Sequence, residues 1–127
     1  MFASWKRYCG FAAAVPLVLA TIGAADAQAP YPNRNINLVL PFAAGSGTDT
    51  TTRLIGKELG TALGVTTVID NKAGANGSIA ASYVARSAPD GYTLFVTTNT
   101  THSANPYLLK NMSYDPIKDF TLSLIHI

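Results

Sequence analysis

Cysteine is almost absent from this sequence, since Cys9 is the only one among 127 residues. A single cysteine cannot form a disulfide within the chain, and metal sites built on several thiolates are excluded. Cys9 also precedes an apolar run, whereas a lipid-modified cysteine follows such a run, which argues against a lipoprotein anchor. The folded part must therefore be stabilised by packing alone.

An excess of charge of either sign is also missing. Nine Lys and Arg residues stand against seven Asp and Glu residues, and the basic residues are scattered along the chain. A nucleic-acid-binding surface would show clustered Lys and Arg side chains, so the sequence predicts no nucleic-acid partner.

The sequence has no apolar run long enough to span a membrane. The run FAAAVPLVLATIGAA, residues 11–25, is shorter than the roughly 20 apolar residues that a span requires. It follows two basic residues and ends in the small-x-small pattern ADA. This arrangement predicts that residues 1–27 are a secretory signal peptide, cleaved near Ala27/Gln28, and that the protein is exported to the periplasm.

Three apolar or β-branched stretches alternate with two helical patterns. The near-continuous apolar stretch Ile36–Leu40 predicts a strand that Pro41 ends, and Val65–Asp70 and Tyr92–Thr98 predict two more. The order β-α-β-α-β predicts an α/β fold with a parallel sheet and right-handed crossovers. A further short helix is expected from Asn105 to Lys110.

The two main helices are placed by their first residues and by their apolar faces. Thr48 or Asp49 is expected to cap the first helix, because either side chain can accept hydrogen bonds from exposed N–H groups. The apolar stripe of that helix is expected at Ile55, Leu59, Ala62 and Leu63 before Gly64 ends it, and the second helix is expected to be capped by Ser78 and to bury Ile79, Tyr83 and Val84.

The loop PFAAGSGTD, residues 41–49, is the strongest candidate for a functional motif. A phosphate-binding P-loop requires a lysine that this loop lacks, and a dinucleotide fingerprint requires a third glycine where Thr50 stands. A hydrolase elbow requires Gly-x-Ser-x-Gly, whereas Ser46 has glycines directly on both sides. An exported α/β hydrolase that uses Ser46, with His102 as its base, is therefore an alternative and not the main hypothesis.

The same loop has the features of an anion site. N–H groups at a helix start lack partners and carry partial positive charge, and glycines let a ligand approach them closely. Ser46 and Thr48 add hydroxyl donors, and the absence of Lys and Arg favours a modestly charged carboxylate over a polyphosphate. An ordinary tight turn between a strand and a helix explains the same residues.

A second polar loop, TTNTTHSANP, follows the third predicted strand. Parallel strands place both loops at their carboxyl ends, which is the edge where open α/β sheets bind ligands. Thr98, Thr101, His102 and Asn105 supply neutral hydrogen-bonding groups there. The same side chains could instead close loop turns and cap the next helix, and a structural hydrogen bond explains His102 equally well.

Three segments, YPNRNINLVLPFAAGSGTD, VIDNKAGANGSIAASYVARSAPDGYTLFVTT and THSANPYLLKNMSYDPIKDF, resemble the receptors of tripartite tricarboxylate transporters, which are Bug-type extracytoplasmic solute-binding proteins. The resemblance implies the first α/β lobe of a two-lobed, type II-like periplasmic binding protein. Such a receptor closes on a small carboxylate (an amino acid, dicarboxylate or tricarboxylate) and passes it to membrane permease subunits. No catalytic residue, metal or cofactor is implied. A ligand sensor for a signalling partner is the other function that this lobe suits.

The resemblance assigns the ligand site to the two polar loops. Phe42 would form a wall of the pocket, and Asp49 would orient the loop and cap the helix, because a bare carboxylate would repel an anion. Ser46 departs from the glycine-rich run that the family often has here. The residues implied in ligand binding are Phe42, Ala43, Gly45, Ser46, Gly47, Thr48, Asp49, Thr98, Thr101, His102 and Asn105, with Gly74 and Gly77 at the border of the cleft.

Members of the transporter receptor family are far longer than this chain. The sequence predicts a signal peptide at residues 1–27 and the first lobe at residues 28–121. The shorter length predicts a truncated or non-native tail at residues 122–127 and no second lobe. A cleft with one wall leaves its ligand half solvated. Such a fragment is expected to bind carboxylates weakly or not at all.

Overall fold

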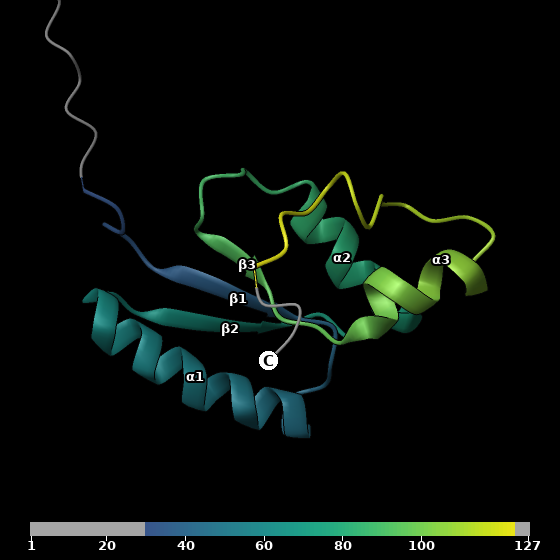
Figure 1. The fold of residues 1–127 in the computed structure, drawn as a ribbon. Helices are drawn as coiled ribbons and strands as arrows, with labels where there is room; N and C mark the ends of the chain where they lie inside the picture. The colour runs from purple at the N-terminus through teal and green to yellow at the C-terminus, as the bar shows by residue number, and fades with distance from the viewer. Residues whose placement is uncertain (1–29, 124–127) are drawn as a thin grey trace, which may run out of the picture.

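The computed structural model describes residues 30–123, which form a three-stranded parallel sheet with helices on both sides (Figure 1). Its elements are β1 (Ile36–Leu40), α1 (Gly47–Leu63), β2 (Thr67–Asn71), η1 (Ala75–Gly77), α2 (Ser78–Ala85), β3 (Thr93–Phe95), η2 (Thr100–Ala104) and α3 (Asn105–Leu108). The strand order β2-β1-β3, with parallel pairing throughout, confirms the predicted α/β fold and its β-α-β-α-β core.

Some predictions fall outside the described part of the chain. The predicted signal peptide with its cleavage site lies there, as do residues 124–127 of the predicted tail. Among the helices of residues 30–123, none combines the length and the apolar character that crossing a membrane requires.

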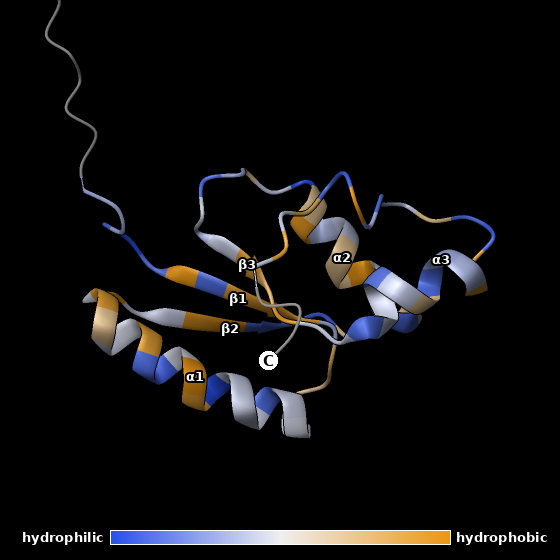
Figure 2. Ribbon diagram, viewed as in Figure 1, coloured by the Kyte–Doolittle hydropathy of each residue, from blue (hydrophilic) through white to orange (hydrophobic). Residues whose placement is uncertain are grey.

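Strand β1 lies at the centre of the sheet and supplies most of the core. Ile36, Leu38, Val39 and Leu40 are at most 3% exposed, because β1 is the central strand and both α1 and α2 contact it from the two faces of the sheet. Figure 2 shows hydrophobic residues along most of this strand. A strand buried on both faces needs such an apolar run, and each buried aliphatic side chain contributes about 1.5–3 kcal/mol.

Helix α1 begins and ends at well-defined caps. Ser46 is the N-cap, with an extended backbone (φ −66°, ψ 162°) and an Oγ that accepts a hydrogen bond from the Asp49 N–H at 3.2 Å. The prediction that Thr48 or Asp49 is the cap was wrong, because both residues lie inside the first turn. The predicted end is confirmed, since Gly64 has a φ of 68° and its N–H bonds to the Gly60 carbonyl.

The face that α1 turns to the sheet is built from small residues. The predicted stripe does not form this face, since Ile55 is 58% and Leu63 38% exposed, while Gly56 and Gly60 are buried. A Cβ atom at Gly56 would lie 2.9 Å from Thr67 Oγ1, and one at Gly60 would lie 2.7 Å from the Val65 carbonyl oxygen. Helix and sheet therefore approach too closely for the large side chains that the apolar pattern favoured.

Helix α2 shows the same departure from its predicted orientation. The residues 80–82 are buried, whereas Ile79 is 52% and Tyr83 40% exposed and Val84 is half-buried. Ser78 does not cap the helix, because it is the first helical residue and Gly77 is the N-cap without a side-chain hydrogen bond. Small residues again lie where the helix meets the sheet.

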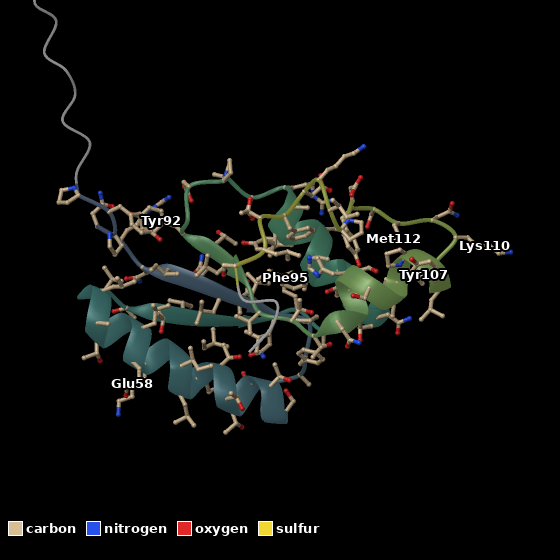
Figure 3. The ribbon with its side chains drawn as sticks, viewed as in Figure 1. Glu58, Tyr92, Phe95, Tyr107, Lys110 and Met112 are labelled. Carbon is tan, nitrogen blue, oxygen red and sulfur yellow. The ribbon has the colours of Figure 1, made fainter. Side chains whose placement is uncertain are left out.

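The region after β3 is more helical than predicted. Strand β3 is shorter than the predicted Tyr92–Thr98, and a wide helical turn, η2, leads directly into α3. The helix predicted from Asn105 to Lys110 is confirmed at its start but ends at Leu108. Residues 110–123 then return across the molecule, where Phe120 stacks on Phe95 with ring centroids 5.8 Å apart. Figure 3 shows Phe95 in the interior and Tyr107 at the far end of α3.

Candidate functional site

Three loops meet at the edge of the sheet where the strands end (Figure 1). They are the β1–α1 loop (residues 41–46), the turn containing η1, and η2. A Cβ atom at Gly77 of η1 would lie 2.6 Å from Thr101 Cγ2 and 3.1 Å from Pro41 Cβ. The middle glycine turn is therefore wedged between the two loops that the sequence predicts to share one edge.

The middle turn has a left-handed backbone throughout. Gly74, Ala75, Asn76 and Gly77 have φ angles of 127°, 47°, 51° and 83°. Residues with a Cβ atom adopt such angles at a cost of about 1–3 kcal/mol when their surroundings enforce them. One contact that holds this turn is the hydrogen bond from Asn105 Nδ2 to the Asn76 carbonyl, at 2.9 Å.

Several N–H groups of the first loop are already used within the loop. The Gly45 N–H donates to Asp49 Oδ2 at 2.8 Å, and the Ser46 N–H donates to the Ala43 carbonyl at 3.2 Å. Within residues 30–123, the N–H groups of Ala43, Ala44, Gly47 and Thr48 have no hydrogen-bond partner. Those of Gly47 and Thr48 lie in the first turn of α1, where the helix dipole adds partial positive charge.

Asp49 is buried, and its carboxylate faces three donors. Arg53 Nε donates to Oδ2 at 3.0 Å, the Gly45 N–H donates to the same oxygen, and Asn71 Nδ2 donates to Oδ1 at 3.0 Å. The hydrogen bonds from Arg53, Gly45 and Asn71, in that order of size, lower the pKa of Asp49 to about 2. Asp49 therefore remains ionised at neutral pH and is turned toward the loop, as its predicted orienting role requires.

The other residues of the first loop lie nearer the surface. Phe42 is half-buried, and its carbonyl accepts a hydrogen bond from Asn71 Nδ2 at 3.0 Å. Ala43, Gly45 and Gly47 are exposed, so the backbone between them is accessible. The Ser46 hydroxyl serves as the helix cap, and His102 Nδ1 pairs with Thr101 Oγ1, so the described residues contain no Ser46–His102 hydrogen bond. The hydrolase arrangement is thus not formed.

The second predicted loop is largely helical, and two of its predicted site residues are buried. Thr101 is 1% exposed and Asn105 is fully buried, so their side chains are not the accessible loop donors that the sequence favoured. Asn105 Nδ2 also lies 3.1 Å from Tyr114 Oη, and the Tyr114 hydroxyl donates to the Thr101 carbonyl at 2.7 Å. Thr98 is exposed. The alternative that these polar groups hold the local structure therefore describes Thr101 and Asn105.

His102 lies between two aromatic rings. Its ring centroid is 6.0 Å from that of Phe95 and 4.8 Å from that of Phe120. Burial lowers the pKa of His102 from its usual value, which favours the neutral imidazole. Its Nδ1 lies 2.9 Å from Thr101 Oγ1, which accounts for one ring nitrogen.

Three buried polar atoms near the second loop lack partners. They are Ser78 Oγ, His102 Nε2 and Asn105 Oδ1, counted over the described residues. A buried polar atom without a partner costs about 1–3 kcal/mol, so water or a ligand group is expected to satisfy such atoms. They lie in α2, η2 and α3, at or beside the meeting point of the loops.

A metal centre finds no support in the described chain. No group of three or more His, Cys, Asp or Glu side chains within residues 30–123 is arranged to hold a metal ion. A surface hollow of about 490 Å³ lies between α1 and the edge strand β2. It is lined by residues such as Gly56, Gly60 and Ile69 and is not the site described here.

The sequence reasoning missed three residues of this region: Arg53, Asn71 and Tyr114. The i,i+4 spacing of Asp49 and Arg53 on a predicted helix is a signal for an ion pair that could have found Arg53. Asn71 directly follows a predicted strand at the carboxyl edge, which is a weaker signal. Tyr114 lies in a segment without periodicity, and no sequence pattern places it beside Thr101 and Asn105.

Comparisons of the sequence identify related proteins. The family model described as "Tripartite tricarboxylate transporter family receptor" matches residues 51–126. A UPF0065 protein from Bordetella bronchiseptica is 42% identical over 105 residues, which are 82% of this chain and 31% of the relative. The chain therefore spans about a third of the length of this curated relative.

Comparisons of the structure identify periplasmic binding proteins. MatC from Rhodopseudomonas palustris, solved with bound malate, superposes with a TM-score of 0.68 and 46% identity over 72% of this chain and 31% of MatC. An R. palustris protein solved with adipate superposes with a TM-score of 0.66 and 44% identity. The match covers 68% of this chain and 29% of that protein. The periplasmic binding protein BugD superposes with a TM-score of 0.64 and 43% identity, over 68% of this chain and 28% of BugD.

Proposed function

The chain belongs to the tripartite tricarboxylate transporter receptor family, and from this premise we propose that it captures a small carboxylate in the periplasm for a membrane permease. The observation that carries the proposal is that the N–H groups of Gly47 and Thr48, beside the junction of three loops, have no hydrogen-bond partner among residues 30–123. Unpaired N–H groups at a helix start suit a carboxylate oxygen.

The charge around these groups agrees with a carboxylate of modest charge. The β1–α1 loop carries no Lys or Arg, and the Asp49 carboxylate is paired with Arg53 and turned toward Gly45. An anion near the helix start therefore meets partial positive charge and no bare negative group. MatC was solved with malate and its R. palustris relative with adipate, so dicarboxylates of this size are the first candidates.

The predicted site residues divide into two roles in this proposal. Ala43, Gly47 and Thr48 offer free backbone N–H groups, Phe42 forms a wall, and Thr98 offers an exposed hydroxyl. The remaining predicted residues hold the loops in place: Gly45, Ser46, Asp49, Thr101, His102 and Asn105. Within residues 30–123 the Ser46 hydroxyl caps α1 and His102 Nδ1 pairs with Thr101 Oγ1, so Ser46 and His102 do not form the nucleophile–base pair that the hydrolase alternative requires.

The proposal includes the organisation inferred from the sequence. Residues 1–27 act as the export signal, residues 28–121 form one lobe of the receptor, and the permease subunits are the partners that receive the ligand. The residues that the structure describes form one lobe, and by itself this lobe would contact a ligand from one side. We expect half-saturation of this lobe at a carboxylate concentration of about 1 mM or higher. A half-saturation at about 1 mM corresponds to a binding free energy of about −4 kcal/mol.

A titration followed by NMR tests the function on the chain itself. Malate and adipate should shift the amide resonances of Ala43, Gly47 and Thr48 in the ¹⁵N-labelled chain, while malamide, an uncharged analogue of malate, should not. Absence of any shift in the β1–α1 loop at 50-fold the expected half-saturation (about 50 mM) would refute the proposal, and so would an equal response to malamide.

One substitution removes a single N–H group from the site. Gly47→Pro deletes the N–H at the first helical position, where proline is favoured, and Ser46 already has the extended backbone that a following proline requires. Gly47→Ala is the matched control, because a Cβ atom at Gly47 meets nothing within 4 Å. Gly47→Pro should weaken malate binding about tenfold, and Gly47→Ala should leave it within about twofold.

A further inference from the structure

Three side chains close a ring of hydrogen bonds beside the β1–α1 loop. Asn71 Nδ2 lies 3.0 Å from Asp49 Oδ1, and Arg53 Nε lies 3.0 Å from Asp49 Oδ2. Arg53 Nη2 completes the ring at 3.4 Å from Asn71 Oδ1. Asp49 and Arg53 belong to α1, whereas Asn71 is the last residue of β2, so the ring bridges the helix and the neighbouring strand.

The ring is hydrogen-bonded to the β1–α1 loop at two points. Asn71 Nδ2 donates to the Phe42 carbonyl at 3.0 Å, and the Gly45 N–H donates to Asp49 Oδ2 at 2.8 Å. Between Phe42 and Gly45 lie the two alanines whose N–H groups have no partner in the described part of the chain. The residues on both sides of this exposed pair of alanines are thus hydrogen-bonded to side chains from outside the loop.

The charges within the ring cancel. Asp49 is 2% exposed and is kept ionised by its three donors, while Arg53 supplies the opposite charge. Asn71 contributes hydrogen bonds without adding a charge. A carboxylate can therefore hold the loop in place without presenting its negative charge to an anionic ligand.

The geometry points to Asp49, Arg53 and Asn71 as a positioning clamp that holds the free N–H groups of the β1–α1 loop ready for a carboxylate, with Asn71 as the strand-borne member. Asn71 acts through Phe42 and Asp49 and need not touch the ligand. The inference rests on the proposed function, because the position of the loop matters to binding only if the loop receives a ligand. Preformed hydrogen-bonding groups raise affinity by reducing the ordering cost of binding.

Amide hydrogen exchange without ligand tests the clamp. In Asn71→Ala the protection of the Gly45 amide should fall about tenfold or more, since the hydrogen bond to Asp49 loses its support, while the amides of β1 remain protected. Asp70→Asn is the matched control on the same strand, because Asp70 pairs with Lys72 at 3.1 Å and is not a member of the ring. Unchanged Gly45 protection in Asn71→Ala would overturn the inference.

A second variant makes the clamp respond to pH. In Asn71→Asp an ionised carboxylate faces Asp49, so the ring should open at pH 7 and close again in acid, when a protonated residue 71 can donate a hydrogen bond to Asp49. The charged groups facing this position are Asp49 and Arg53 of α1, and the flanking Asp70 and Lys72 pair with each other. Gly45 protection that returns below about pH 5 supports the clamp, because a purely steric role would give no recovery.

The two variants remain informative if Asn71→Ala does not fold. Refolding of Asn71→Asp in acid, together with recovered Gly45 protection, supports the clamp, and acid refolding without that protection overturns it. Malate titrations separate the clamp from the proposed function. If Asn71→Ala lowers Gly45 protection and malate affinity together, both stand. If Gly45 protection falls but the unsubstituted chain binds no carboxylate, the clamp stands and the proposed function fails.

Discussion

Gly77 and Thr101 come from different loops and lie in van der Waals contact. A Cβ atom added at Gly77 would stand 2.6 Å from Thr101 Cγ2, far inside the normal contact distance. Gly77 also has a φ of 83°, which L side chains rarely adopt. The absence of a side chain at residue 77 therefore allows the η1 turn and η2 to meet.

Gly77→Ala should destabilise the fold by about 1–3 kcal/mol, because the added methyl group forces the two loops apart. Gly45→Ala is the matched control, since Gly45 has the same φ of 83° but nothing within 4 Å of an added Cβ atom. Urea unfolding of both variants separates the clash from the backbone strain. Equal losses of stability would contradict the close approach at Gly77.

Gly60→Ala should also destabilise the fold by about 1–3 kcal/mol, although alanine is normally the better helix former by about 0.5–1 kcal/mol. The reason is the Val65 carbonyl oxygen, 2.7 Å from the added Cβ atom. Ile55→Ala removes a much larger side chain that is 58% exposed, and its effect should stay within about 0.5 kcal/mol. Thermal unfolding that ranks Ile55→Ala as the more harmful change would refute this orientation of α1.

The stability of the chain should fall in acid as Asp49 is protonated. Its pKa is lower in the folded chain (about 2) than the ordinary value of 3.8, so the stabilisation is present above pH 4 and is lost as the pH falls through about 2. In Asp49→Asn the free energy of unfolding, measured with urea between pH 2 and 6, should depend less on pH than in the unsubstituted chain. A curve for Asp49→Asn that matches the unsubstituted chain would contradict the prediction.

Ser46→Ala should cost about 1 kcal/mol of stability through loss of the α1 cap. Ser46→Asp should restore the cap, because aspartate accepts the same hydrogen bond, but its negative charge should weaken carboxylate binding. Calorimetric unfolding and malate titration of the two variants measure these effects separately. Tighter malate binding by Ser46→Asp would contradict the placement of an anion at this loop.

The elements that the sequence predicted correctly have strong local signals. The apolar run Ile36–Leu40 needs burial on both faces, and Gly64 adopts the left-handed conformation that ends a helix. In both cases a few neighbouring residues carry the signal: an unbroken apolar run for the strand and a glycine for the end of the helix. The parallel pairing of the strands followed from their alternation with helices, whereas the spatial order β2-β1-β3 was not predicted.

The orientations of the helices could not be predicted in the same way. Apolar periodicity identifies the side chains that gain most from burial, and so it selected Ile55 and Ile79. The structure instead buries Gly56 and Ala80, because close approach of a helix to a sheet requires small residues. Hydropathy carries no signal for such contacts, since glycine has no side chain to count.

The candidate site was predicted in its location and only partly in its details. Both polar loops lie at the carboxyl edge of the sheet, as parallel topology requires. Which donors remain free depends on competing bonds within the loops, such as those of Gly45 to Asp49 and of Asn105 to Asn76. Competition of this kind involves residues up to 29 positions apart and leaves no local pattern in the sequence.

Tyr114 joins the last part of the described chain to the second loop, through its hydrogen bonds with Thr101 and Asn105. A chain that emerges from its N-terminus can pair β1 with β2 and β3 before residue 114 has appeared. The buried backbone of η2 stays without this partner until then. The carboxyl edge of the sheet, where the proposed site lies, therefore depends on a residue that follows the sheet in the chain, and it is complete only when residue 114 is in place.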